Sequence, residues 1–223
     1  MPFADRTEAG QKLAKALAKH KSERPVVLAL PRGGLPVARE VAAALGAPLD
    51  LVLVRKIGVP MQPELAMGAV VDGPKPLTVR NEDVIRLTGV TDADFGAVRD
   101  REVAEIGRRR TKYLGDRPHP DLAGCTAIVV DDGIATGATM RAALQAVRAR
   151  KPKKLVLAVP VAPTSTLAEL RREVDEVACL EDSEAFGAIS LYYDDFRQVS
   201  DEEVTAILAE FPPEPSPVGR RPA

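Results

Sequence analysis

Two adjacent carboxylates, Asp131 and Asp132, stand between an apolar run and a short stretch of small and hydroxyl residues. Carboxylates accept hydrogen bonds from paired sugar hydroxyls, so twin acids at the end of a strand suit a ribose diol. The stretch behind them includes a glycine free to take dihedral angles forbidden to other residues, which lets several backbone N–H groups converge on one phosphate. The pattern therefore predicts one loop for a ribose and its 5-phosphate, with the phosphate on Ala135, Thr136, Gly137, Ala138 and Thr139.

The alternative for this loop is a plain strand-to-helix turn in which the two acids cap the helix and are solvated. A Thr-Gly-x-Thr string alone would favour that alternative. The coincidence of twin acids, glycines and hydroxyls favours the phosphate loop. The sequence lacks the other common nucleotide patterns, GxxxxGK[ST] and GxGxxG.

Cations gather behind two further apolar runs. Arg32, Gly33 and Gly34 follow the run at 26–30 and precede a helix, while Arg55 and Lys56 follow the run at 49–54. Backbone N–H groups at the start of a helix attract anions, so the first group predicts a second anion site. The alternatives are a simple strand-to-helix turn for the first group and a solvated strand end for the second.

The periodicity of apolar residues places these loops at one edge of a sheet. The runs at 26–30 and 49–54 flank a segment with helical spacing, which predicts a strand-helix-strand unit with a right-handed crossover. The order recurs with runs at 126–130 and 154–161 around a helix at 139–149, and their near-continuous apolarity predicts strands buried on both faces. We therefore predict an α/β fold with a doubly wound, mostly parallel, five-stranded sheet.

The segment between the two halves predicts an insertion. It contains a short strand at 66–71, an extended piece at 76–80 and a long polar helix at 91–114, whose sparse apolar positions place it on the outside. Helices are also expected near the N-terminus and after Ser200, which can form a capping box with Glu203. We predict a single domain over 1–211, with its core at about 25–161, and a disordered tail at 212–223.

Composition excludes several classes. A formal net charge of −1 argues against a broad basic surface, so binding to nucleic acid is not expected. Cys125 and Cys179 stand apart from each other and from the two histidines, which predicts reduced thiols and no zinc site. The absence of an apolar leader or a membrane-length apolar run predicts a cytoplasmic protein.

The string from Val129 to Thr139 resembles the phosphoribosyl diphosphate (PRPP) motif of the type I phosphoribosyltransferases, because it reads hydrophobic-hydrophobic-Asp-Asp-Gly-x-x-Thr-Gly-x-Thr. The resemblance covers roughly 25–200 in element order. It implies the type I fold, with a mobile loop at 57–66, a small C-terminal hood at about 176–200 and a cis peptide bond near Pro31 and Arg32. It also implies that pyrophosphate binds to Arg32, Gly33, Gly34, Arg55 and Lys56, and that a base stacks on Phe186, Tyr192 or Tyr193.

The resemblance further implies an enzyme of nucleotide metabolism that transfers the 5-phosphoribosyl group from PRPP to a nitrogenous acceptor and releases pyrophosphate. Asp131, Asp132 and Arg32 are the expected catalytic residues. Mg²⁺ is the expected cofactor, bound through PRPP and, through water, to Asp131 and Asp132. A homodimer is expected by analogy.

The resemblance does not identify the acceptor. The segment 176–200 has no lysine of the kind that 6-oxopurine enzymes use, and 57–66 lacks the lysine and histidine of orotate enzymes. The chain is most similar to a poorly characterised bacterial branch with PRGG after the first strand. Two alternatives are a non-catalytic regulatory protein that binds PRPP and a hydrolase or phosphatase with Asp131 as nucleophile.

Overall fold

The centre of the molecule is a five-stranded, all-parallel sheet in the order β2-β1-β6-β7-β8. The computed structural model describes residues 2–73 and 76–213. The strands span β1 Pro25–Ala29, β2 Leu49–Leu51, β6 Thr126–Val130, β7 Lys154–Pro163 and β8 Glu176–Ser183. The predicted parallel α/β sheet is confirmed, and the carboxyl ends of β1 and β6 lie side by side because Ala29 pairs with Val130.

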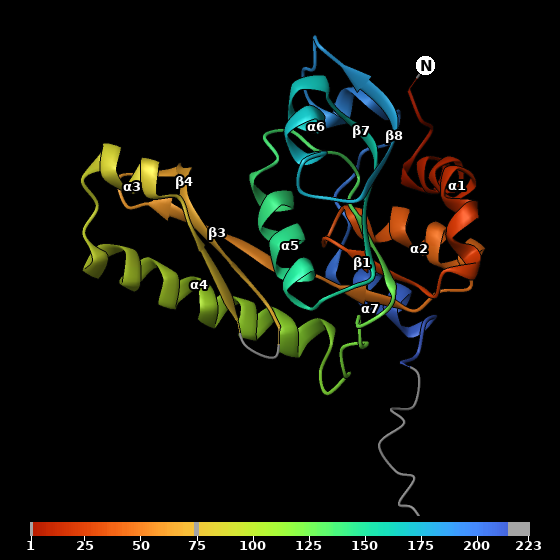
Figure 1. The fold of residues 1–223 in the computed structure, drawn as a ribbon, viewed down its shortest axis with the longest axis horizontal. Coiled ribbons are helices and arrows are strands. Elements are labelled where there is room, and N and C mark those ends of the chain that lie inside the picture. The colour runs from red at the N-terminus through yellow and green to blue at the C-terminus, as the bar shows by residue number, and fades with distance from the viewer. Residues whose placement is uncertain (1, 74–75, 214–223) are drawn as a thin grey trace, which may run out of the picture.

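Helices cover both faces of this sheet (Figure 1). Val27 and Ala29 of β1 belong to the core under α1 Arg6–Leu17 and α2 Gly34–Leu45. Val26 and Leu28 belong to the other core, under α5 Ala138–Ala149 and α6 Thr164–Leu170. Since neighbouring residues of a strand point to opposite faces, an unbroken apolar strand supplies both cores at once.

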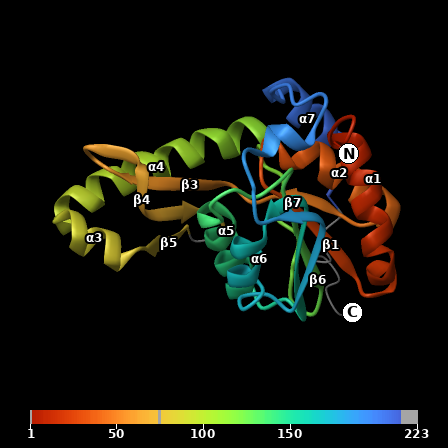
Figure 2. The ribbon, with the colours of Figure 1, turned by 90° about the horizontal axis from the view of Figure 1, so that it is seen from above.

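An arm projects from this body, which Figures 1 and 2 show from two directions. We use "arm" for the described residues from 54 to 113, and "body" for the rest. The arm is an antiparallel sheet of β3 Val54–Val59, β4 Gln62–Val71 and β5 Leu77–Arg80, followed by α3 Glu82–Thr88 and α4 Asp92–Tyr113. Phe95, Val98 and Ile106 of α4 are buried.

Three segments differ from their predicted form. The run 49–54 is divided between two strands, because the chain leaves the body after β2 and begins β3 at Val54. Apolar residues continue across this boundary, so the sequence pattern does not show where one strand ends and the next begins. Residues 57–66 form the tip of the β3–β4 hairpin rather than an irregular loop, with Val59 paired to Gln62. The fifth strand of the body is β8, so 176–183, predicted as the start of a hood, pairs with β7 in the main sheet.

The N-terminal segment meets the segment that follows β8. Phe3 forms a parallel bridge with Tyr193, next to the 3-10 turn Ile189–Tyr192, and a second 3-10 turn at Ala18–Ser22 follows α1. The last helix, α7 Asp201–Ala209, begins with the predicted capping box of Ser200 and Glu203. Of the tail predicted at 212–223, residues 214–223 lie outside the described part. No helix in the described ranges combines the length and apolarity needed to cross a membrane.

Candidate functional site

The two glycine-containing loops meet at the adjacent ends of β1 and β6. A Cβ on Gly33 would lie 2.0 Å from Oδ2 of Asp132, and one on Gly34 would lie 2.8 Å from Cα of Asp131. Only glycine allows this approach, because real Cβ atoms do not tolerate such distances. The bond between Pro31 and Arg32 is cis, as expected. The loops that sequence patterns identified separately therefore form one surface.

Asp132 is buried and has an arginine partner, Arg6, at the start of α1. Arg6 approaches Oδ2 of Asp132 with Nε and Nη2, both at 2.8 Å. The Tyr193 hydroxyl donates to the backbone carbonyl of Asp132 at 2.6 Å. A buried carboxylate needs such partners because leaving the charge unpaired costs several kcal/mol. The contact leaves Oδ1 of Asp132 free of Arg6.

Asp131 lies in a different electrostatic setting. Its Oδ1 accepts a hydrogen bond from the backbone N–H of Asp132 at 2.9 Å. Burial, together with the negative charge of Asp132, raises the pKa of the Asp131 carboxyl well above its usual value. The pair therefore resists holding two full negative charges until a cation or hydroxyl donors approach it.

The predicted phosphate loop leads directly into α5. Gly137 has φ 75°, within the left-handed region, and is the N-cap of α5, where no side chain caps the helix. Ala135, Thr136 and Ala138 are exposed and Thr139 is half-buried. The Thr166 hydroxyl of α6 donates to the carbonyl of Ala135 at 3.1 Å and supports the loop from behind. Uncapped N–H groups at a helix start form an anion site.

A cleft of about 360 Å³ opens beside the paired loops. The Arg32 side chain, 30% exposed, reaches it together with Gly33 and Asp132. Its walls are formed by Arg6, Arg32, Gly33, Asp132, Phe196, Gln198 and Val199. Three residues with predicted roles are thus brought together, and Arg6, Phe196 and Gln198 join them.

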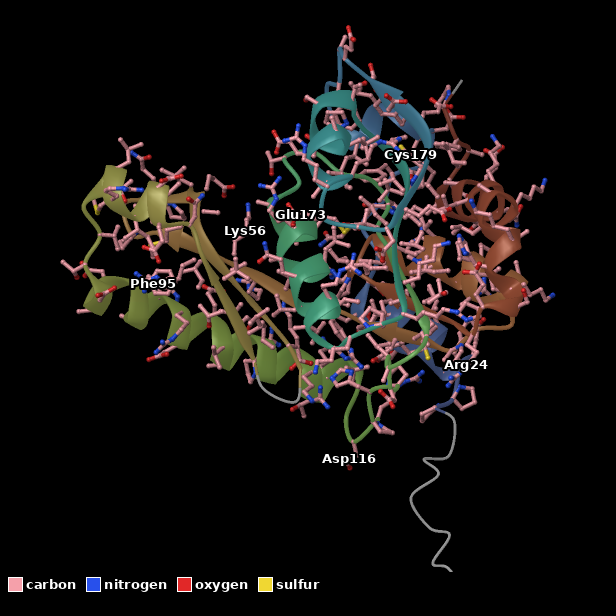
Figure 3. The ribbon with its side chains drawn as sticks, in the orientation of Figure 1. Arg24, Lys56, Phe95, Asp116, Glu173 and Cys179 are labelled. Carbon is pink, nitrogen blue, oxygen red and sulfur yellow. The ribbon has the colours of Figure 1, made fainter. Side chains whose placement is uncertain are left out.

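Arg55 and Lys56 lie elsewhere, because they belong to the arm strand β3 and not to the end of a body strand. Arg55 Nε donates to Oε2 of Glu102 at 2.8 Å, and Lys56 Nζ lies 3.7 Å from the exposed carboxylate of Glu64. Both line a second cleft of about 390 Å³ whose far wall includes Thr139. Lys56 projects from the arm toward α5 in Figure 3. These cations therefore face the phosphate loop and share no lining residue with the cleft of Arg32.

The predicted stacking aromatics do not line the Arg32 cleft. Tyr193 is 5% exposed and packs between Phe3 and Phe196, so its ring faces other aromatic side chains rather than the cleft. Phe186 and Tyr192 stack on each other, with centroids 5.1 Å apart. Phe196 is the aromatic on the cleft wall, and the Arg6 guanidinium lies 3.9 Å from its centroid.

Arg6 was missed by sequence reasoning. Arg6 and Asp132 are 126 positions apart, and no local pattern joins residues at that separation. The sequence offered only a weak signal for a role of Arg6: it is a charged residue directly after the helix-capping Asp5 and near the apolar Phe3.

Within the described ranges, no three His, Cys, Asp or Glu side chains are grouped so as to hold a metal ion together.

Comparison with known proteins gives consistent results. Residues 4–197 match the family described as the phosphoribosyl transferase domain. Proteins from two strains of Mycobacterium tuberculosis, each with the provisional name of phosphoribosyl transferase, are 47% identical over 206 residues. That alignment covers 92% of this chain and 46% of each relative, so the chain spans about half the length of these relatives.

Solved structures agree on the architecture. The crystal structure of the Thermus thermophilus protein TT1426 is 43% identical in sequence and has a TM-score of 0.82; the match covers 95% of this chain and all of that one. The AQ2163 protein from Aquifex aeolicus is 12% identical, with a TM-score of 0.50 and coverage of 82% of this chain and 76% of the other. At that identity the second likeness shows the fold alone.

Proposed function

Because the chain belongs to the phosphoribosyl transferase domain family, we propose that it transfers the 5-phosphoribosyl group of PRPP to a nitrogenous acceptor and releases pyrophosphate. The observation that carries this proposal is the contact of two anion-binding loops. Gly33 and Gly34 press against Asp131 and Asp132 at a distance that excludes any side chain. The phosphate loop at the start of α5 lies just beyond the same two acids, so a ligand with a phosphate, a diol and a diphosphate fits the arrangement.

Each part of the donor then has a place. The 5-phosphate binds to backbone N–H groups and hydroxyls of 135–139, and the ribose hydroxyls bind to Asp131 and Asp132. The diphosphate binds to Arg32 and to the backbone of Gly33 and Gly34. Such a displacement passes through an oxocarbenium-like state, so the protein positions the reactants and stabilises charge rather than supplying a nucleophile.

We assign Arg55 and Lys56 to the phosphate end of the donor rather than to the diphosphate. Their cleft includes Thr139, the last residue of the phosphate loop. Lys56 is 44% exposed and its distance of 3.7 Å from Glu64 is a loose contact, so its ammonium can turn to an arriving anion. Arg55 is held more firmly by Glu102, whose side chain is 10% exposed.

Magnesium is part of the proposal. Asp131 and Asp132 offer carboxylate oxygens, which Mg²⁺ prefers. Burial and, after it, the charge of Asp132 raise the pKa of Asp131, and a bound cation would favour its ionised form. When bound with the donor, the ion would neutralise charge on the diphosphate. Arg32, Gly33 and Gly34 hold the leaving group in place, and Arg6 keeps Asp132 oriented toward the ribose.

The acceptor enters the cleft beside Arg32. Phe196 contributes an aromatic ring to the wall and Gln198 a neutral amide, which suits a flat nitrogen-containing ring better than a charged chain. This assignment replaces the stacking role predicted for Tyr193. The first experiment should identify this acceptor ring.

Pyrophosphate release tests the proposal directly. The protein is incubated with PRPP, Mg²⁺ and a panel of purines, pyrimidines and simple amines, and release should depend on one acceptor class. Asp131→Asn with Asp132→Asn should remove turnover, whereas Asp83→Asn, in an exposed arm pair with Arg86, should leave it unchanged. Tight binding of PRPP without release on any acceptor would favour the regulatory alternative, and absence of both binding and release would end the proposal.

A further inference from the structure

A chain of contacts joins the end of the arm helix to Arg32. Nη1 of Arg32 lies 3.5 Å from Oδ1 of Asp201, the first residue of α7. On its other side, the Asp201 carboxylate meets the end of α4: the Lys112 ammonium pairs with Oδ2 and the Tyr113 hydroxyl donates to Oδ1. One carboxylate of the body is therefore held by two arm residues while it contacts one residue of the cleft.

Asp201 is a permanent charge in this position. Hydrogen bonds from Lys112 and Tyr113 lower the pKa of the Asp201 carboxyl to about 2. Tyr113 is 9% exposed, so its ring is fixed by the packing around it and its hydroxyl gives Asp201 a rigid anchor. The carboxylate can therefore fix a flexible partner without being flexible itself.

Arg32 is such a partner. Among the described residues, Asp201 is its one partner at ion-pair distance, and the contact involves one terminal nitrogen. A guanidinium carries five N–H donors, so most of the fork stays available in the cleft. Asp201 does not line that cleft, although its neighbours Gln198 and Val199 do, so it touches Arg32 from outside the ligand space.

We propose that Asp201 is a positioning residue: it holds the Arg32 guanidinium at the mouth of the cleft so that the free N–H donors meet the diphosphate of the donor. The inference rests on the proposed function, since it requires that Arg32 binds diphosphate. Ordering the side chain before the ligand arrives removes part of the conformational entropy that binding would otherwise cost. Lys112 and Tyr113 act on Arg32 only indirectly, because they hold the Asp201 carboxylate in place.

Calorimetry with two probes, PRPP and inorganic pyrophosphate, each with Mg²⁺, tests this inference. Asp201→Asn keeps the volume and can still accept from Tyr113 but loses the charge, so the Kd of both probes should rise about two- to fivefold, the range of a partly exposed ion pair. Arg32→Ala should raise both Kd values about 10- to 100-fold, as expected for charge-assisted hydrogen bonds. In the Arg32→Ala background, Asp201→Asn should add nothing, because the residue through which it acts is gone.

The matched control is Glu202→Gln. Glu202 is exposed, lies next to Asp201 in the first turn of α7 and contributes the same helix-terminal charge, so its removal should leave both Kd values unchanged. If Asp201→Asn fails to fold, Tyr113→Phe loosens the same carboxylate without removing its charge and should weaken both probes in the same direction.

Two results would overturn the inference while leaving the proposed function intact. One is a Kd for PRPP in the Asp201→Asn protein that equals the wild-type Kd. The other is an effect of Asp201→Asn that persists undiminished in the Arg32→Ala protein, since this would make Asp201 a structural link between α4 and α7. Failure of the wild-type protein to bind either probe would overturn the proposed function and, with it, this inference.

Discussion

The Arg6–Asp132 pair of the body and the ion pairs within single helices of the arm hold their charges in opposite ways. In the body, Arg6 and Asp132 are about 10% exposed and come from positions 126 apart. In the arm, Arg86 pairs with Asp83 on α3 and Arg108 pairs with Glu105 on α4, each three positions apart; both arginines are exposed, Asp83 is exposed and Glu105 is half-buried. Buried pairs between distant segments fix geometry, whereas exposed local pairs contribute little. Opening the buried pair of the body should therefore cost far more stability than opening a local pair within an arm helix.

The largest effect is expected from Gly33→Ala. The new Cβ would fall 2.0 Å from Oδ2 of Asp132, so the two loops must separate. We expect PRPP binding to weaken by about 100-fold or more, since misplacement by about 1 Å has that effect on positioned groups. Calorimetry measures it, and circular dichroism checks that the fold is retained. Binding equal to wild type would show that the contact between the loops is not part of the site.

The second-largest effect, a loss of stability, is expected from Arg6→Met. The substitution keeps an apolar stem but leaves the buried Asp132 carboxylate without its cation, which should cost about 3 kcal/mol of the free energy of unfolding. Urea denaturation measures the loss. The arm counterpart, Arg108→Met, opens an exposed pair and should leave the denaturation midpoint unchanged. Equal effects of the two substitutions would remove the contrast between body and arm.

A third prediction concerns the junction of the two regions. His119 contacts Asp50 of β2 and Asp72 at the end of β4, and these carboxylates raise the pKa of His119 from 6.5 to about 9. Protonated His119 stabilises the fold fully below about pH 6.5, and this contribution disappears as the pH rises through 9. We expect the free energy of unfolding to fall by about 2 kcal/mol across this window, after allowance for screening.

Chemical denaturation at pH 6 and at pH 9.5 measures this difference. His119→Gln is the control, because it removes the titrating group and should flatten the dependence relative to wild type. The same slope in both proteins would assign the change to other groups.

The smallest effect is expected from Gly96→Ala in the arm. This glycine lies within α4, and a Cβ there would meet no atom within 4 Å. Alanine is the better helix former, so the substitution should stabilise the protein by about 0.5–1 kcal/mol and leave PRPP binding unchanged. Thermal unfolding measures the gain. A loss of binding here would mean that the arm is coupled to the site more tightly than its exposed surface indicates.

Features set by local chemistry were predictable from sequence. The strand ends at Ala29 and Val130, the glycine at 137 and the capping box at Ser200 each follow from a few neighbouring residues. The predicted parallel sheet follows because strand-helix-strand units leave few alternatives. These elements alone place the loop after β1 next to the loop after β6.

Features set by packing between distant segments were not predictable. The division of 49–54 into β2 and β3 depends on where the chain leaves the body, and apolar residues run through that point. Arg55 was therefore assigned to a body strand end although it lies on the arm. Tyr193 looked like a free ring because nothing local reveals that Phe3 covers it.

The hydrogen bond from Tyr193 to the backbone of Asp132 sets an order of events during synthesis. Asp132 leaves the ribosome 61 residues before Tyr193, the residue whose hydroxyl secures its backbone. At translation rates of roughly 5–20 residues per second, that interval lasts about 3–12 s. The nascent sheet can pair its early strands in that time, but the finished pocket must wait for the segment around Tyr193 to emerge.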